Sequence, residues 1–510
     1  MILQREKGAA VQAMGRLAGV DPIGVLDIGS NSVRLVIYEH HARTLTPLFN
    51  EKATCALGRG VAKTGVIAQE NAELALKAIA RFGLVTRLMA VPVVHVVATS
   101  AVREASNGPA FMAQVELLME AKGHVLSGEE EAYFAARGIV SGMPDFIGLV
   151  GDLGGGSLEF ASVQKGKATR GETFKLGVIR LQDESGMAPD AGVNIVRKRL
   201  KNSRVLADCD CEVFCAIGGT WRAFAELMQV REDYPLHMVQ GYEVKAKDAL
   251  KLAKLLIEDA QKVEGIQTVS RARRDLLAYG AAVLIGILEG AKFKKVIFSS
   301  QGVREGYLFD LLNPEEAALD PLIEACEEIC FLRSRSVTHA VELETFTEKF
   351  LSALGQSESK AQRRLRIASC LLSDIGWRGH RDYRGEQSVD LIAYNALLGI
   401  DHAGRAFMAE VLAVRYMGLK HKSSSKALNS LMGEKAHVHA RTLGALIRMA
   451  YVLSGAMPQI LPEIEFEVNK DALKLILPGE LSFLDSLRLQ SRLSQLAKHL
   501  GFGESAIVVR

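Results

Sequence analysis

The sequence has no apolar run long enough to cross a bilayer. Its longest uncharged apolar stretch, residues 276–288, includes two glycines and a tyrosine, whereas a membrane-spanning helix needs about 20 apolar residues. The first twenty residues lack the apolar core of a secretory signal and carry four charges, at Arg5, Glu6, Lys7 and Arg16. We expect residues 1–20 to form a mobile leader, the protein to be cytoplasmic, and no integral membrane contact.

The sequence also lacks a strong net charge. Lys and Arg number 62 and Asp and Glu 59, which leaves a formal charge of +3. A polyanionic ligand must therefore be held by a local basic patch, because the whole-protein field is weak. We expect no nucleic acid partner. The balance of 48% hydrophobic and 24% charged residues is typical of a soluble globular enzyme.

Cysteine is scarce for a chain of this length. Seven cysteines in 510 residues do not indicate a disulfide framework. Three of them lie close together in CDCEVFC, at Cys209, Cys211 and Cys215. Their spacing is not the CxxC of metal sites, and EVFCAIGG is typical of a buried strand. We interpret them as small buried hydrophobic residues rather than metal ligands.

The pattern along the chain predicts several domains, since 510 residues exceed what one hydrophobic core organises. Strands and helices alternate, with a helix expected from about Gln69 to Met89, and the pattern restarts near residue 146. Strand signals then vanish in favour of helical periodicity. A hairpin around Asn469, Lys470 and Asp471 and a final strand follow. The predicted segments are 1–20, 21–143, 144–313, 314–442 and 443–510.

Two stretches share one turn pattern. VLDIGSNSVRLVIYE and VGDLGGGSLEFASVQ each place an aspartate at a strand end, Asp27 and Asp152, with glycine two residues later and serine five residues later. A hairpin requires only the glycine. The shared carboxylate and serine therefore favour a duplicated domain over two unrelated hairpins.

Both turns suit phosphate binding. Glycine lets successive backbone N–H groups point into one concavity, where phosphate oxygens accept from them. Because aspartate repels phosphate, we expect a divalent cation between them, and Mg²⁺ suits oxygen ligands. AIGGT forms a third loop of this kind. The predicted phosphate-binding residues are Gly29, Ser30, Asn31, Ser32, Gly154, Gly155, Gly156, Ser157, Gly218, Gly219 and Thr220.

Six motifs in order, within residues 24–310, give a specific resemblance: DIGSNSVRLVI, ATSAVREA, SGEEEA, DLGGGSLEF, AIGGT and SQGVREGYL. This set resembles the exopolyphosphatase / guanosine pentaphosphate phosphohydrolase family, within the actin, sugar-kinase and heat-shock-chaperone ATPase superfamily. The resemblance implies an α/β fold of duplicated actin-like (ribonuclease H-like) ATPase domains. An all-helical HD-like domain, a small α/β C-terminal domain and a homodimer are implied as well.

The resemblance assigns catalysis to Glu131, the last acid of SGEEEA. The presence of Glu129 and Glu130 is explained by their position at a helix start, where acidic residues are favourable. A carboxylate can orient and deprotonate the water that attacks a phosphoanhydride. Arg103 follows a buried strand, and its guanidinium can pair with a phosphoryl oxygen. We place it at a helix start, where a cation opposes the helix dipole, and this favours a functional role. Arg304 suits phosphate binding and a salt bridge equally well.

The expected metal ligands are Asp152, Glu159 and Asp27, with Asp27 in a supporting role. Glu159 lies on the strand that leaves the second loop, so it shares the cleft with Asp152 only if Ser157 faces the cleft too. The predicted cofactor is Mg²⁺, with a monovalent cation such as K⁺ as a further candidate.

The helical segment resembles a metal-dependent His-Asp phosphohydrolase domain at LRIASCLLSDIGW. Ser373 stands where the metal-binding histidine would be, and Asp374 alone cannot make that site. We therefore expect no second catalytic centre. Residues 378–384 and 415–426 are basic and are candidate linings of a polyanion channel, although a solvated surface explains each charge as well.

The leading hypothesis is an exopolyphosphatase that releases orthophosphate from inorganic polyphosphate. The same machinery suits the 5′-phosphate of guanosine pentaphosphate, a substrate that would link the protein to the stringent response. A more distant alternative is an ATP-dependent small-molecule kinase of the same superfamily. A binding protein without turnover is the non-enzymatic alternative, and Glu131 with the two aspartates argues against it.

Overall fold

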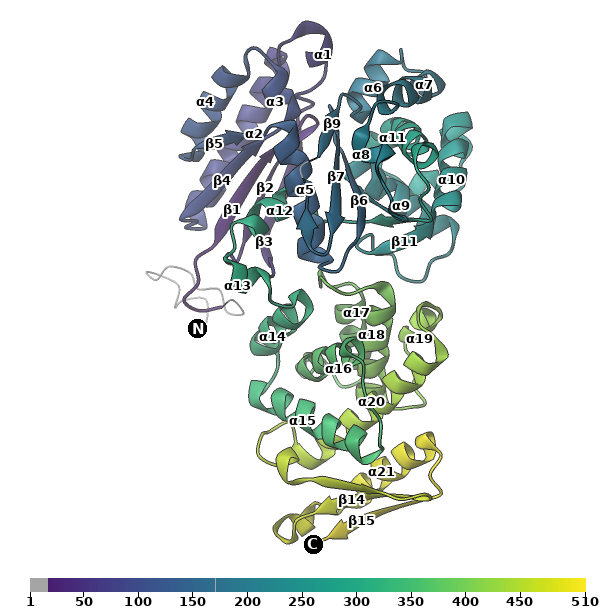
Figure 1. Cartoon of the computed structure of the whole chain (residues 1–510). Coiled ribbons are helices and arrows are strands. Elements are labelled where there is room, and N and C mark those ends of the chain that lie inside the picture. Colours follow the sequence, from purple (N-terminus) through teal and green to yellow (C-terminus); the bar gives the residue numbers. More distant parts are fainter. Residues whose placement is uncertain (1–16, 170) are drawn as a thin grey trace. The chain divides into compact units, whose positions relative to one another are not determined.

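A computed structural model describes residues 17–169 and 171–510 (Figure 1). The chain divides into two compact units after Leu319, an N-terminal unit of Leu17–Leu319 and a C-terminal unit from Asp320 to Arg510. Most of the predicted leader at residues 1–20 lies outside the described residues. The division falls six residues after the predicted boundary at residue 313.

The first sheet has the strand order β3-β2-β1-β4-β5. Strands β1, β2 and β3 form an antiparallel meander, and β4 and β5 extend the sheet in parallel with β1. Its residues alternate across two covered faces, so strands such as β1 are buried almost throughout. The strand bounds are β1 Ile23–Ile28, β2 Ser32–Tyr38, β3 Pro47–Thr54, β4 Val93–Ala98 and β5 Gly123–Val125.

The second sheet repeats this arrangement. Its order is β11-β12-β10-β6-β7-β8, with β9 also paired to β7. The antiparallel pair β6–β7 and the parallel pair β6–β10 correspond to β1–β2 and β1–β4. The predicted duplication is thus present in the topology. The bounds are β6 Gly148–Leu153, β7 Leu158–Gln164, β8 Lys167–Ala168, β9 Glu172–Phe174, β10 Val213–Ile217, β11 Tyr242–Lys245 and β12 Lys295–Phe298.

Helices cover both sheets, as Figure 1 shows for α2 and α4 beside the first sheet and α9, α10 and α11 beside the second. The predicted helix at 69–89 is confirmed as α2. The larger helices of this unit are α2 Gln69–Leu88, α4 Gly108–Met119, α5 Gly128–Gly142, α7 Pro189–Leu200, α9 Gly219–Arg231, α10 Ala246–Asp259, α11 Arg271–Gly290 and α12 Val303–Asp310. The shorter ones are α1 Val61–Thr64, α3 Ser100–Glu104, α6 Val178–Glu184, α8 Arg204–Ala207 and α13 Pro314–Ala317.

Helices α5 and α12 pack backbone to backbone. A methyl group on Gly306 of α12 would lie 1.8 Å from the carbonyl oxygen of Phe134 in α5, and one on Gly138 would lie 2.3 Å from the carbonyl oxygen of Gly302. Only glycine permits this approach. It brings the helix of SGEEEA and the helix of SQGVREGYL, far apart in the sequence, to one place.

The C-terminal unit is helical up to residue 454. Helix α18 is buried on all sides from Ala406 to Val414, as expected for a central helix. The predicted domain boundary at residue 442 falls inside α20. The helices are α14 Pro321–Arg333, α15 Val337–Ala353, α16 Lys360–Leu372, α17 Arg384–Ala393, α18 His402–Met417, α19 Ser425–Leu428 and α20 Glu434–Ser454.

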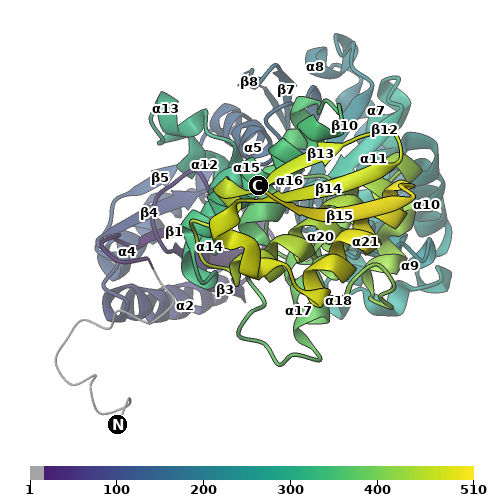
Figure 2. The same cartoon turned by 90° about the horizontal axis from the view of Figure 1, so that it is seen from below.

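A three-stranded sheet ends the chain (Figure 2). Strands β13 (Glu465–Val468) and β14 (Ala472–Leu477) form the predicted hairpin, in which Asn469 Oδ1 accepts from the N–H of Ala472 at 2.8 Å. Strand β15 (Glu504–Val509) adds in parallel to β14, after helix α21 (Leu487–Leu500). Across residues 17–169 and 171–510, no helix combines the length and apolarity of a membrane span.

Candidate active site

The two glycine loops close with the same hydrogen bond. The N–H of Gly29 donates to the carbonyl of Ser32 at 3.0 Å, and the N–H of Gly154 donates to the carbonyl of Ser157 at 3.0 Å. Among the described residues, the N–H groups between these pairs, on Ser30, Asn31, Gly155 and Gly156, donate to no acceptor. Four donors are thus available to an anion, as the sequence predicts.

The loops face each other and touch. A methyl group on Gly155 would lie 3.1 Å from Ser30 Cβ, and one on Gly156 would lie 3.1 Å from Ser30 Oγ. Ser100 of α3 lies beside both loops, with its Oγ 2.9 Å from Ser30 Oγ. Arg180 holds the two halves together from the second one: its Nε donates to the carbonyl of Gly156 at 2.9 Å, and its guanidinium pairs with Glu104. The approach explains why the second loop needs glycines: a side chain at Gly156 would separate the halves.

The third loop adjoins the second. Strand β10 runs parallel to β6, with Ile217 beside Asp152, so the turn into α9 opens at the same edge of the sheet. Gly218 has φ +111°, and a methyl group there would lie 2.3 Å from the carbonyl oxygen of Leu153. One on Gly219 would lie 3.9 Å from the Arg273 guanidinium. Arg273 of α11, a cation that none of the six motifs contains, therefore lies beside this loop.

Two carboxylates face each other across the β6–β7 hairpin. Asp152 pairs with Glu159 in the strand register, and Glu159 is buried, with Oε1 accepting from Thr173 Oγ1 at 3.0 Å. Burial raises the pKa of Asp152 to about 6, against the opposing charge of Arg222. Burial and the charges of Glu131 and Asp152 raise the pKa of Glu159. A cation between such carboxylates would relieve both effects.

Glu131 enters the site from the first turn of α5. Ser127 and Glu130 form a capping box at this helix start, so Glu130 has the structural role expected of it. Glu131 instead is buried, with 5% of its surface exposed. Burial raises its pKa to about 7, Arg103 opposes the rise, and the charge of Asp152 adds to it. A carboxylate with this pKa is suited to accept a proton near neutral pH.

Arg103 forms an ion pair with Glu131 and also donates to the carbonyl of Leu126. The structure thus joins the two residues that the sequence assigns to catalysis. One premise was wrong: Arg103 lies in the last turn of the short helix α3, where a cation is favourable, and not at a helix start. Its link to Glu131 replaces that premise as the reason to regard it as functional.

Arg304 makes the salt bridge that was one of its two predicted roles. Its guanidinium pairs with Glu305, its Nε donates to the Tyr38 hydroxyl at 3.2 Å, and Nη1 lies 3.9 Å from Asp27 Oδ2. Burial would raise the pKa of Glu305, but Arg304 and the N–H of Gly302 hold it below its usual value. Arg304 therefore ties α12 to the first loop, and its contact with phosphate stays a prediction.

Sequence reasoning missed four cations around the aspartates: Arg34, Lys52, Arg222 and Arg273. Burial and the charge of Arg273 lower the pKa of Arg222 and of Lys52, so these cations lie close enough to repel one another. The Nε of Arg222 has no partner among the described residues. We call these four residues the basic wall. Arg34 lies within the first motif and Arg222 just after the AIGGT loop, so both could have been noticed, whereas Lys52 and Arg273 have no distinguishing pattern.

Asp152 and Glu159 suit a magnesium ion whose remaining ligands are water molecules and substrate phosphates. Within residues 17–169 and 171–510, no three His, Cys, Asp or Glu side chains are placed to hold a metal by themselves. Asp152, Glu159 and Asp27 therefore do not form a closed cage, although burial raises the pKa of each. Mg²⁺ retains waters and binds substrate phosphates through one or two carboxylates. The facing pair of Asp152 and Glu159 suits that mode.

In the C-terminal unit an arginine neutralises Asp374. Arg335 forms two hydrogen bonds with this carboxylate, at 2.7 and 2.8 Å, and Arg415 lies 3.7 Å away. Ser373 Oγ, at the position of the expected histidine, lies 2.9 Å from the Tyr451 hydroxyl. Asp374 is thus held by arginines and Ser373 by a tyrosine, and the absence of a second catalytic centre stays a prediction.

The two predicted basic segments converge in that unit. Burial and the charges of Arg492, Arg415, Arg488 and Arg384 lower the pKa of Arg448 to about 10. Arg448 also donates to the carbonyls of residues 415 and 416, at 2.8 and 2.6 Å. One arginine from each predicted segment thus joins three that sequence reasoning missed, and the cluster is a candidate polyanion contact.

The topology is that of duplicated actin-like domains. A family model described as the Ppx/GppA phosphatase family matches residues 36–315, and one described as exopolyphosphatase, C-terminal, matches residues 322–507. The first match spans more than half of the sequence. The chain therefore belongs to the Ppx/GppA phosphatase family.

Two solved structures agree on the fold, and a third is similar with a lower TM-score. An exopolyphosphatase from Cytophaga hutchinsonii is 24% identical, with a TM-score of 0.51, over 57% of this chain and 97% of that one. A protein described as exopolyphosphatase-like is 23% identical, with a TM-score of 0.50, over 57% and 97%. The Ppx/GppA family member from Aquifex aeolicus is 22% identical, with a TM-score of 0.48, over 56% and 96%.

Proposed function

We propose that this protein is an exopolyphosphatase that hydrolyses the terminal phosphoanhydride bond of inorganic polyphosphate and releases orthophosphate. The observation that carries the proposal is the convergence of Glu131, Arg103, Asp152 and Glu159 beside three glycine loops. The family membership and the similarity to an exopolyphosphatase support the substrate class.

The reaction needs a water molecule in line with the anhydride oxygen. Glu131 accepts a proton from this water as its oxygen bonds to the terminal phosphorus and the anhydride bond breaks. The shortened polyphosphate leaves with the anhydride oxygen, and orthophosphate remains at the loops. A pKa of about 7 lets the Glu131 carboxylate be ionised and still basic near neutral pH.

The other residues bind and orient the substrate. The free N–H groups of Ser30, Asn31, Gly155 and Gly156 donate to the terminal phosphoryl oxygens. Arg103 keeps Glu131 oriented, and its charge stabilises the transition state. The basic wall binds the phosphoryl groups that follow. Asp152 and Glu159 would hold Mg²⁺, which supplies charge neutralisation for the phosphoryl oxygens.

A substrate panel tests this assignment. Orthophosphate release is measured from polyphosphates of several lengths, guanosine pentaphosphate and ATP, each with and without Mg²⁺. We expect Mg²⁺-dependent release from polyphosphate, with a higher kcat/KM than from the other two. A higher kcat/KM for guanosine pentaphosphate would transfer the assignment to that substrate. Phosphate transfer from ATP to a small acceptor would indicate a kinase, and binding without release would indicate a non-enzymatic role.

A further inference from the structure

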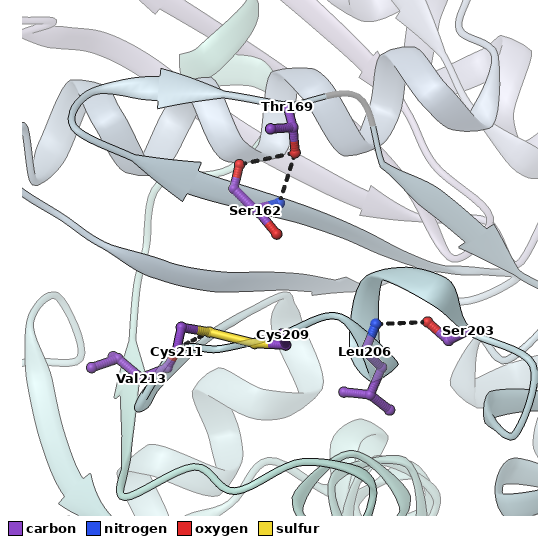
Figure 3. Close-up of a disulfide and its surroundings, with 7 residues drawn as sticks. All are labelled: Ser162, Thr169, Ser203, Leu206, Cys209, Cys211 and Val213. Carbon is purple, nitrogen blue, oxygen red and sulfur yellow. Dashed lines mark hydrogen bonds between the residues drawn. A yellow bond between two sulfur atoms is a disulfide. The ribbon is translucent and has the colours of Figure 1, made fainter.

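Cys209 and Cys211 differ from the other cysteines of the chain. They form a disulfide in the loop between α8 and β10 (Figure 3), and each is only partly buried. The remaining five are free and fully buried, at Cys55, Cys215, Cys326, Cys330 and Cys370. Burial raises the thiol pKa of Cys370 to about 12, and such thiols are inert. Reactive sulfur is therefore confined to the pair. No disulfide was expected from the sequence.

A cleft opens at this pair. Its volume is about 330 Å³, at the lower end of small-molecule sites. One wall is the loop at 208–213, which carries both sulfurs, and the other comes from residues 147–148 and 162–164 of the β6–β7 region. A small molecule in the cleft would lie against the disulfide.

The loop accommodates the reduced state as well. The Cα atoms of Cys209 and Cys211 lie 5.5 Å apart, within the ordinary disulfide range. Cys211 Sγ also lies 3.7 Å from the carbonyl oxygen of Val213, where a thiol donates a weak hydrogen bond. Ser203 Oγ caps α8 through the N–H of Leu206 at 3.1 Å, and β10 holds the other end of the loop. The two ends of the loop are therefore held by contacts that do not involve the disulfide.

The charges around the pair are negative. Asp208, Asp210 and Glu212 line the cleft, and all three are exposed. Lys294 pairs with Glu212, whereas within residues 17–169 and 171–510 neither aspartate forms an ion pair. An anionic thiol is therefore repelled at this cleft, and a neutral or cationic one is not.

We propose that Cys209 and Cys211 form a reversible thiol–disulfide exchange site that takes small neutral or cationic thiols from this cleft. A thiolate RS⁻ attacks one cysteine sulfur, the S–S bond breaks, and the other cysteine leaves as a thiolate that takes up a proton. A second RS⁻ attacks the mixed disulfide, forming RSSR and releasing the first cysteine. Two RSH thus become RSSR while the pair gains two hydrogens, and excess RSSR reverses the reaction.

The exchange lies apart from phosphate chemistry. Strand β10 separates the pair from the Gly218–Thr220 loop by five residues of extended chain, roughly 16 Å. We therefore expect orthophosphate release by Cys209→Ser and Cys211→Ser to equal that of the parent protein. The proposal does not rest on the function assigned above.

The test uses the full-length protein without denaturant. The oxidised protein is treated with 2-mercaptoethanol, cysteamine or reduced glutathione at equal thiolate concentration, alkylated and examined by peptide mass spectrometry. We expect two alkyl groups on the peptide with Cys209 and Cys211 and none on the other five cysteines. Labelling of the pair only after denaturation would overturn the proposal, as would a pair that small-molecule disulfides never oxidise.

Two variants sharpen the result. Cys209→Ser leaves Cys211 without its partner, so treatment with cystamine should add one cysteamine by mass and stop there. Glutathione should reduce the parent protein about threefold more slowly than cysteamine, and Asp208→Asn with Asp210→Asn should remove this difference. Equal rates in the parent protein would overturn the selectivity for neutral and cationic thiols.

Discussion

Asp152 and Glu159 lie directly opposite each other on the two strands of the second glycine hairpin. In the first hairpin the same register places Arg34 opposite Asp27. One copy of the duplicated turn thus places an arginine opposite its aspartate, and the other places two carboxylates opposite each other. Like charges directly opposite are destabilising unless a cation joins them. This difference places magnesium at the second hairpin in our account and gives Asp27 a supporting role.

Glu159→Gln should weaken activation by Mg²⁺ about tenfold or more, because it removes one of two facing carboxylates. The measurement is orthophosphate release as a function of Mg²⁺ concentration. Asp27→Asn is the matched comparison and should shift the Mg²⁺ midpoint less, since Arg34 lies opposite this aspartate in the strand register and Arg304 Nη1 lies 3.9 Å from its Oδ2. A larger shift for Asp27→Asn would contradict the assignment.

Arg103→Ala should lower kcat about a hundredfold and also move the pH profile. Burial raises the pKa of Glu131 to about 7, and Arg103 opposes this rise, so its removal raises the pKa further. The base then ionises only at higher pH, and the acidic limb of kcat shifts upward. Arg103→Lys retains the positive charge and should return the acidic limb part of the way to its position in the parent protein. A lower kcat with an unmoved limb would limit Arg103 to transition-state stabilisation.

Arg273→Ala should raise the KM for polyphosphate and reduce its dependence on salt, because a cation of the basic wall is lost. We expect several-fold effects on KM with a smaller change in kcat. Arg271→Ala, an exposed arginine at the start of the same helix, is the control and should match the parent protein. Equal effects of both substitutions would point to general charge rather than to the wall.

Acid should destabilise the C-terminal unit through Glu410. Burial raises the pKa of this carboxyl, but hydrogen bonds from His421 and Ser425 and the pairing with Arg441 lower it to about 2. The folded pKa lies below the unfolded value near 4.5, so the contribution, about 3 kcal/mol, is complete above pH 4.5 and lost as the pH falls toward 2. Thermal unfolding between pH 3 and 7 should show this loss, and Glu410→Gln should flatten the slope.

The duplicated turn and the residues beside it could be predicted from sequence because each motif records its local geometry. The turn that follows Asp152 is closed by a hydrogen bond between Gly154 and Ser157, three residues apart, so its geometry is set by the local sequence. The pairing of Arg103 with Glu131 joins two motifs, and each motif indicates one partner. Lys52 and Arg273 could not be found in this way, since only the packing of distant elements brings their charges together.

The most direct test of the account is orthophosphate release from long-chain polyphosphate in Mg²⁺ by Glu131→Gln, with Glu129→Gln as control. Both glutamates lie in the first turn of α5, but Glu131 is buried and Glu129 is exposed. We expect Glu131→Gln to lose at least about a hundredfold in kcat, as removal of a general base does, and Glu129→Gln to retain full activity. Near-normal turnover by Glu131→Gln would contradict the assignment of the base.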